Sequence, residues 1–103
     1  MSQPIPTEIS TALYRIIQES LTNIYKHSAA TFVSIHLQQS LEAIYLQIDD
    51  NGRGFDPEGN TTGFGLQGMR ERTTALGGQF VLTSQPGLGS QIKVSIPLPR
   101  RAL

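Results

Sequence analysis

Three stretches of the chain carry residue types that could bind a phosphate, a metal ion or a polar base. The first is a polar stripe at positions i, i+4, i+7 and i+8 of an expected helix, so its side chains lie one above another. Acid, amide and amine in one column suit a metal–phosphate group, since an amide oxygen binds Mg²⁺ and lysine supplies a mobile positive charge. The alternative is a solvated helix face with a Glu–Lys pair. The stripe consists of Glu19, Asn23, Lys26 and His27.

The second stretch follows an alternating, strand-like run and reads "IDDNGRGFDP", residues 48–57. Asn51 and Gly52 would suit a hairpin turn, because both tolerate positive φ. A plain hairpin resumes a strand within about two to five residues. Here the polar chain instead continues to Thr62, which indicates that this strand end does more than reverse the chain.

The third stretch, Gly63–Gly68, matches G-x-G-x-x-G and leads into an expected helix. A dinucleotide fingerprint needs a strand directly before the glycines, and here the polar segment Asn60–Thr62 precedes them. A protein-kinase glycine loop needs further motifs and a much longer chain. Glycines at a helix start still let backbone N–H groups approach a phosphate, which the helix dipole favours. The alternative is a flexible loop entering a helix.

Taken together, these stretches resemble the ATP-binding catalytic domain of sensor histidine kinases, which has the Bergerat-type ATPase fold shared with DNA gyrase and mismatch-repair ATPases. Tyr14–Ala30 is similar to the N box of that family, Asp49–Phe55 to the first glycine box and Gly63–Arg72 to the second. Thr83–Pro97 is similar to the closing strand pair. The residues in these boxes resemble those of the subgroup of nitrate-sensor and cell-envelope or membrane-fluidity sensor kinases.

The resemblance implies a role for each box in binding ATP. Asp50 would accept the exocyclic amino hydrogen of adenine, and its carboxylate would reject the carbonyl of guanine. Gly52 and Gly54 would let the chain pass close to the purine. Ser90 corresponds to a hydroxyl that helps to hold the adenine side, and residues 55–62 would form the ATP lid.

The same resemblance implies catalytic and phosphate-binding roles for the polar stripe. Asn23 would be the Mg²⁺ ligand and Lys26 a phosphate contact, with His27 beside them. Glu19 is the third candidate catalytic residue, with its role open: many kinases have Asn there, whereas gyrase-type ATPases use Glu to activate water. The loop and helix start facing the phosphates would contain Gly63, Gly65, Leu66 and Gly68.

The implied function is to bind ATP with Mg²⁺ and to donate the γ-phosphoryl group to a histidine on a separate dimerisation and phosphoacceptor domain. A response regulator would be the indirect partner in two-component signalling. Neither His27 in the N box nor His36 in a strand is expected to be the acceptor. One alternative is a serine kinase of the anti-sigma-factor type. Another is a nucleotide-responsive binding module without transferase activity, which Phe64 supports because the subgroup often has histidine there.

Composition is consistent with this interpretation. The chain has 103 residues, eight Lys plus Arg, eight Asp plus Glu, and no cysteine. It therefore suits one domain, lacks a basic field for nucleic acid or membrane, and excludes thiolate metal sites. We expect a linker remnant over residues 1–6 and the catalytic domain over 7–103. The isolated domain is expected to be monomeric and cytoplasmic, although its parent protein could be membrane-anchored.

Apolar periodicity predicts the elements that must position these residues. Helical spacing predicts helices over 7–27, starting near Thr7, and over 66–76, stopped by Gly77 and Gly78. Alternation predicts four strands. The order of elements predicts an α+β two-layer sandwich, with a mixed sheet covered on one face by helices. The expected strands cover residues 31–38, 43–50, 79–84 and 91–96.

Overall fold

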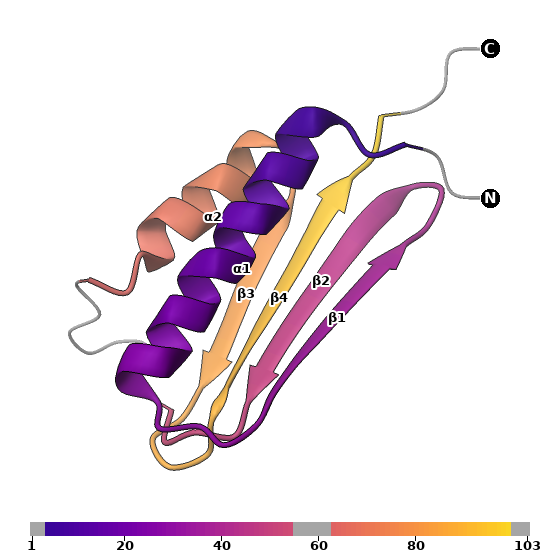
Figure 1. The fold of residues 1–103 in the computed structure, drawn as a ribbon. Helices are drawn as coiled ribbons and strands as arrows, with labels where there is room; N and C mark the ends of the chain where they lie inside the picture. The colour runs from indigo at the N-terminus through magenta and orange to yellow at the C-terminus, as the bar shows by residue number, and fades with distance from the viewer. Residues whose placement is uncertain (1–3, 55–62, 100–103) are drawn as a thin grey trace.

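Two helices lie on one face of a four-stranded sheet in the computed structural model, which describes residues 4–54 and 63–99 (Figure 1). This arrangement confirms the predicted α+β two-layer sandwich. The predicted lid, residues 55–62, lies outside the described residues. In chain order the elements are α1 (Thr7–His27), β1 (Val33–Gln39), β2 (Ala43–Asp50), α2 (Leu66–Ala75), β3 (Gln79–Ser84) and β4 (Ser90–Pro97).

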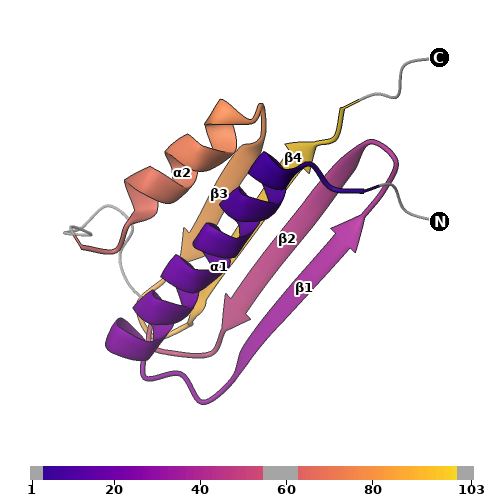
Figure 2. The same ribbon diagram turned by 45° about the horizontal axis from the view of Figure 1, so that its top comes forward.

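The strand order is β1-β2-β4-β3, and each neighbouring pair in the described part of the chain is antiparallel (Figure 2). The expectation of a mixed sheet is therefore wrong. The crossover through α2 does make β2 and β3 run in the same direction. However, β4 lies between them, so the two parallel strands never pair with each other. This is a split β-α-β arrangement.

The helices and the two central strands form most of the core. Ile16 of α1 and Ile96 of β4 are fully buried, and Ile44 of β2 is 1% exposed. These side chains meet because successive strand residues point to opposite faces, so every second residue of β2 and β4 faces the helices. The other large members of this core are Ile9, Leu13, Leu46, Ile48, Met69, Phe80, Ile92, Val94 and Leu98.

Most predicted boundaries agree with the structure, and the differences have local causes. Helix α1 begins at Thr7, but no side chain caps it. Instead the Pro6 carbonyl accepts hydrogen bonds from the N–H groups of Ile9 and Ser10, both at 3.0 Å. Strand β1 begins at Val33 rather than at residue 31, because the N–H groups of residues 31 and 32 donate to Asn51 Oδ1.

Helix α2 ends where the glycine pair predicts. Gly77 has φ +77°, and its N–H donates to the Thr74 carbonyl at 2.9 Å. The N–H of Gly78 donates to the Thr73 carbonyl at 2.9 Å, and a Cβ atom at Gly78 would lie 2.3 Å from the Ser95 carbonyl oxygen. The glycines therefore both end α2 and let the chain approach β4 closely. Neither described helix is long and apolar enough to cross a membrane.

Candidate functional site

A buried carboxylate lies where the two central strands meet the loops. Asp50 is the last residue of β2, and its register partner is Ser90, the first residue of β4. The Ser90 hydroxyl donates to Asp50 Oδ2, and the Gly52 N–H donates to Oδ1 at 2.8 Å. Asp50 is only 9% exposed. A carboxylate can accept about four hydrogen bonds, so this held group retains capacity for a further donor.

Glycines allow three backbone segments to close around this carboxylate. Gly89 has φ +81°, and a Cβ atom there would lie 2.2 Å from the Asp50 carbonyl oxygen. Gly54 has φ +63°, and a Cβ atom there would lie 2.2 Å from the Gln85 carbonyl oxygen. A Cβ atom at Gly52 would lie 2.4 Å from the Ser28 carbonyl oxygen. Close contact with backbone carbonyl groups is therefore enough to require glycine at positions 52 and 54, whether or not a ligand is bound.

The arginine between these glycines has a structural role that the sequence analysis did not assign. Its Nε donates to the His27 carbonyl and its backbone N–H to the Ser28 carbonyl, both at 2.8 Å. Arg53 therefore caps the end of α1, where a positive charge is favourable. No local sequence pattern indicates this role, because the His27 carbonyl that Arg53 contacts lies 26 positions earlier in the sequence.

Three members of the polar stripe on α1 face the segment before α2. The Asn23 Nδ2 group donates to the Phe64 carbonyl. The His27 ring stacks on the Phe64 ring, with centroids 4.4 Å apart and planes at 13°. A Cβ atom at Gly65 would lie 2.5 Å from Glu19 Oε2. The i, i+4, i+8 spacing therefore brings these three side chains onto the second glycine box.

Of the remaining predicted residues, Lys26 and Gly63 are open to solvent, whereas Leu66 and Gly68 are packed within α2. Lys26 lies exposed in the last turn of α1. Gly63, with φ +92°, borders open space, whereas Leu66 packs against the core. Gly68 lies within α2 beside the Arg72 side chain. The glycine loop therefore reaches the stripe, but only its first part is open to a ligand.

Two small cavities connect the candidate residues. One of about 60 Å³ is lined by Asn23, His27, Asp50, Phe64 and Ser90, among others. A second, of about 30 Å³, lies deeper and shares Asn23, Asp50 and Ser90 with the first. The structure thus brings residues from the helix, both glycine boxes and the closing strand pair to one place.

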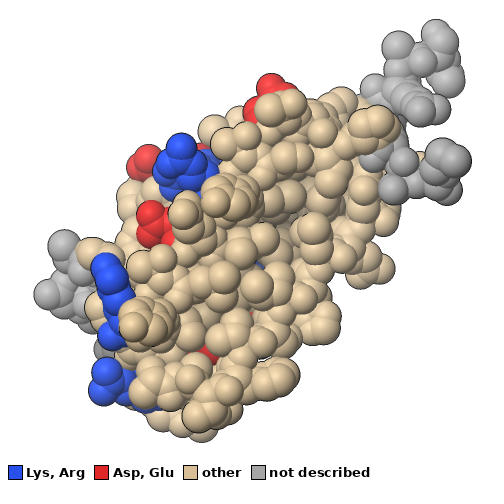
Figure 3. Space-filling view, in the orientation of Figure 1, with Lys and Arg blue, Asp and Glu red and all other residues tan. Residues whose placement is uncertain are grey.

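The charge around this place is positive on its outer side. Lys and Arg side chains gather at the end of the molecule where α1 ends (Figure 3), and Lys26 and Arg53 belong to that end. The described residues contain no group of three His, Cys, Asp or Glu that could hold a metal by themselves. A metal here would need few protein ligands and others from its own ligand, as Mg²⁺ bound to phosphates has.

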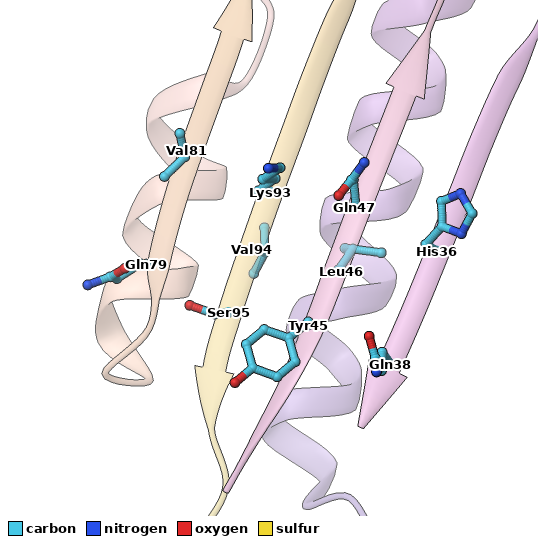
Figure 4. A pocket seen from close by; sticks show the side chains of 10 residues that line it. All are labelled: His36, Gln38, Tyr45, Leu46, Gln47, Gln79, Val81, Lys93, Val94 and Ser95. Atoms are coloured by element: carbon cyan, nitrogen blue, oxygen red, sulfur yellow. The ribbon is translucent and has the colours of Figure 1, made fainter. Parts of the chain in front are cut away.

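A separate hollow of about 370 Å³ lies on the uncovered face of the sheet (Figure 4). Its lining residues lie on the uncovered face, apart from Leu46 and Val94, whose side chains belong to the core on the helix side. No predicted site residue lines it. It is lined by His36, Gln38, Tyr45, Leu46, Gln47, Gln79, Val81, Lys93, Val94 and Ser95.

The fold is a two-layer α+β sandwich, with the candidate residues gathered where its two central strands meet the loops. Residues 8–100 match the family described as "Histidine kinase-, DNA gyrase B-, and HSP90-like ATPase". Because this match spans most of the sequence, the chain belongs to that family.

The relatives of the chain include several sensor kinases. It is 39% identical over 94 residues to the "Signal transduction histidine-protein kinase/phosphatase DegS" of Brevibacillus brevis, covering 90% of this chain and 24% of that protein. It is 43% identical over 89 residues to the "Signal transduction histidine-protein kinase/phosphatase UhpB" of Salmonella typhimurium, covering 86% and 17%. The chain therefore spans about a quarter or less of these relatives.

Solved structures agree with the fold. The "ATP binding domain of PrrB from Mycobacterium Tuberculosis" has a TM-score of 0.71 at 27% identity, covering 94% of this chain and 77% of that one. The "Erythrobacter litoralis EL346 blue-light activated histidine kinase" has a TM-score of 0.76 at 24% identity, covering 91% and 32%. The predicted resemblance to ATP-binding domains of histidine kinases is thus confirmed.

Proposed function

We propose that this chain binds ATP with Mg²⁺ and presents the γ-phosphoryl group to a histidine on a separate dimerisation and phosphoacceptor domain, in two-component signalling. The observation that carries the proposal is the buried Asp50 carboxylate, held by Gly52 and Ser90 and adjoining the polar stripe of α1. The sensor kinases among its relatives support the histidine-kinase function over the serine-kinase alternative.

Adenine recognition follows from the chemistry of the carboxylate. The unused acceptor sites of Asp50 suit the exocyclic amino group of adenine, which donates hydrogen bonds. Guanine has a carbonyl at the equivalent position, and two acceptors facing each other in a buried site would be unfavourable. The site therefore fits an adenine nucleotide better than a guanine nucleotide.

The stripe on α1 supplies groups for the metal and the phosphates. Because Asn23 Nδ2 is directed to the Phe64 carbonyl, its amide oxygen is the group available to a hard cation such as Mg²⁺. When bound, Mg²⁺ would neutralise and orient the phosphates. Lys26 is placed to contact them from the exposed end of the helix. Glu19 lies beside Gly65 at the start of α2, on the side of the stripe that would face the phosphates.

Phosphoryl transfer requires an acceptor from outside this chain. A histidine ring nitrogen would form a bond to the γ-phosphorus while the bond to the bridging oxygen of the ADP leaving group breaks. The chain has two histidines. His27 is stacked on Phe64, and His36 lies on the opposite, uncovered face of the sheet (Figure 4). We place the domain in the cytoplasm, where ATP is supplied.

The transfer can be tested by mixing the chain with radiolabelled ATP and a phosphoacceptor fragment of a relative such as DegS that cannot bind ATP itself. Acid-labile label on the fragment, absent when Asp50→Ala replaces the wild type, is the expected result. Acid-stable label would point to serine phosphorylation instead. ATP binding without any label transfer would favour a nucleotide-responsive binding module.

A further inference from the structure

Phe64 closes the candidate nucleotide site from the side of the second glycine box. Its ring stacks on His27, and its carbonyl accepts the hydrogen bond from Asn23 Nδ2. One residue therefore engages two of the side chains on α1 that are proposed to face the nucleotide. The same ring lines the cavity that also contains Asp50 and Ser90.

The space left behind Phe64 is too small for a nucleotide. The two cavities that lie between Asn23 and Asp50 have volumes of about 60 and 30 Å³, whereas sites for small ligands usually measure about 300–1,000 Å³. A larger hollow of about 350 Å³ also borders Asp50 and Ser90, but neither Asn23 nor His27 lines it. A nucleotide that contacts both the Asp50 carboxylate and the stripe on α1 must therefore displace the Phe64 ring from His27.

The backbone around Phe64 permits that displacement. Gly63 and Gly65 flank it with φ angles of +92° and +69°, in a region that glycine adopts without steric cost. A Cβ atom at Gly63 would meet nothing within 4 Å. On the other side, Met69 N–H donates to the Gly65 carbonyl at 3.0 Å and anchors the start of α2. The ring can thus swing away from His27 while α2 stays in place.

We propose that Phe64 is a latch that competes with the nucleotide for the polar stripe of α1. This inference rests on the proposed function. A closed latch lowers the apparent nucleotide affinity in proportion to the fraction of open molecules. The free energy of a stacked aromatic pair changes the ratio of closed to open molecules by about two- to tenfold. Phe64 therefore tunes the nucleotide affinity of the site.

The test compares four forms of the chain by calorimetry and stopped-flow mixing with Mg-ATP. Phe64→Ala removes the stack and should bind ATP about two- to tenfold more tightly, with faster association. Phe64→Tyr keeps an aromatic ring and should match the wild type. Tyr25→Ala, at a 90% exposed position on the same helix, is the matched control and should also match it. Unchanged or weaker binding by Phe64→Ala would overturn the latch.

An NMR readout of the His27 ring separates the latch from the proposed function. In NMR spectra of the wild type, the His27 ring protons should be shifted by the ring current of Phe64. The shift should disappear both in Phe64→Ala and when the wild type is saturated with ATP. If the wild type binds ATP while His27 keeps its stacked shift, the latch is wrong and the proposed function stands. If neither the wild type nor Phe64→Ala binds ATP, both are wrong.

Discussion

Ser90 donates its hydroxyl hydrogen to Asp50 Oδ2 across the pairing of β4 with β2, although the two residues lie 40 positions apart in the sequence. Because they are register partners, the pairing itself places the hydroxyl beside the carboxylate. The Gly52 N–H holds the other carboxylate oxygen. The Asp50 carboxylate is therefore oriented before any ligand arrives, and the Asp50 side chain needs no rearrangement of its own.

Asp50→Ala should lower ATP affinity at least about tenfold, because a hydrogen bond to a charged group contributes roughly 1.5–3 kcal/mol. The wild type should bind ATP more tightly than GTP, and the substitution should remove most of this preference. Calorimetry with both nucleotides provides the measurement.

The control for that experiment is the neighbouring acid. Asp49 accepts hydrogen bonds from Gln47 Nε2 at 2.8 Å and from Gln91 Nε2 at 2.7 Å. It precedes Asp50 in β2, so its side chain points to the other face of the sheet. Asp49→Ala should leave both nucleotide affinities within about twofold of the wild type. Equal binding of ATP and GTP by the wild type would rule out the adenine assignment.

Ser90→Ala should reduce ATP affinity about two- to tenfold, since Asp50 loses one of the donors that orient it. Ser90→Thr retains a hydroxyl and should recover most of the affinity. A double-mutant cycle tests whether serine acts through the carboxylate. In the Asp50→Ala background, Ser90→Ala should have almost no further effect, and an additive loss would mean that serine contacts the nucleotide independently.

Asn23→Ala should weaken binding of ATP with Mg²⁺ more than binding of metal-free ATP, because the amide oxygen is the proposed metal ligand. Calorimetry with and without Mg²⁺ measures both. Thr22→Ala is the control, since Thr22 is exposed and its hydroxyl donates to the Gln18 carbonyl of its own helix. Equal losses with and without the metal would indicate that Asn23 is not the metal ligand.

Gly89→Ala should destabilise the fold by more than about 3 kcal/mol, whereas Gly87→Ala should cost about 1–2 kcal/mol. Both glycines have positive φ, +81° and +84°, so both substitutions carry the penalty of the left-handed conformation. Only at Gly89 would the new Cβ atom also meet the Asp50 carbonyl oxygen, at 2.2 Å. Urea unfolding of the two variants measures the difference, and similar losses would mean that the loop moves away easily.

Local patterns in the sequence were enough to predict most of the elements. The apolar repeat of α1 predicted its bounds at residues 7 and 27, and alternation did the same for β2 and β3. The glycine pair after α2 predicted its end within one residue. These features depend on neighbours a few residues apart, whose spacing decides which face of a helix or strand is apolar. Helical spacing picked out the polar stripe of α1, but the roles of the candidate site residues came from the family resemblance. That resemblance depends on three motifs in a fixed order, and no single motif was specific enough.

Only the tertiary structure decided how these elements meet. The insertion of β4 between β2 and β3 made the sheet antiparallel and joined Ser90 to Asp50. Packing of the first glycine box against α1 gave Arg53 its role at the end of that helix. The stacking of Phe64 on His27 likewise joins residues 37 positions apart. Such contacts depend on strand order and on packing between layers, which are properties of the whole chain and leave no periodic signal in any short segment.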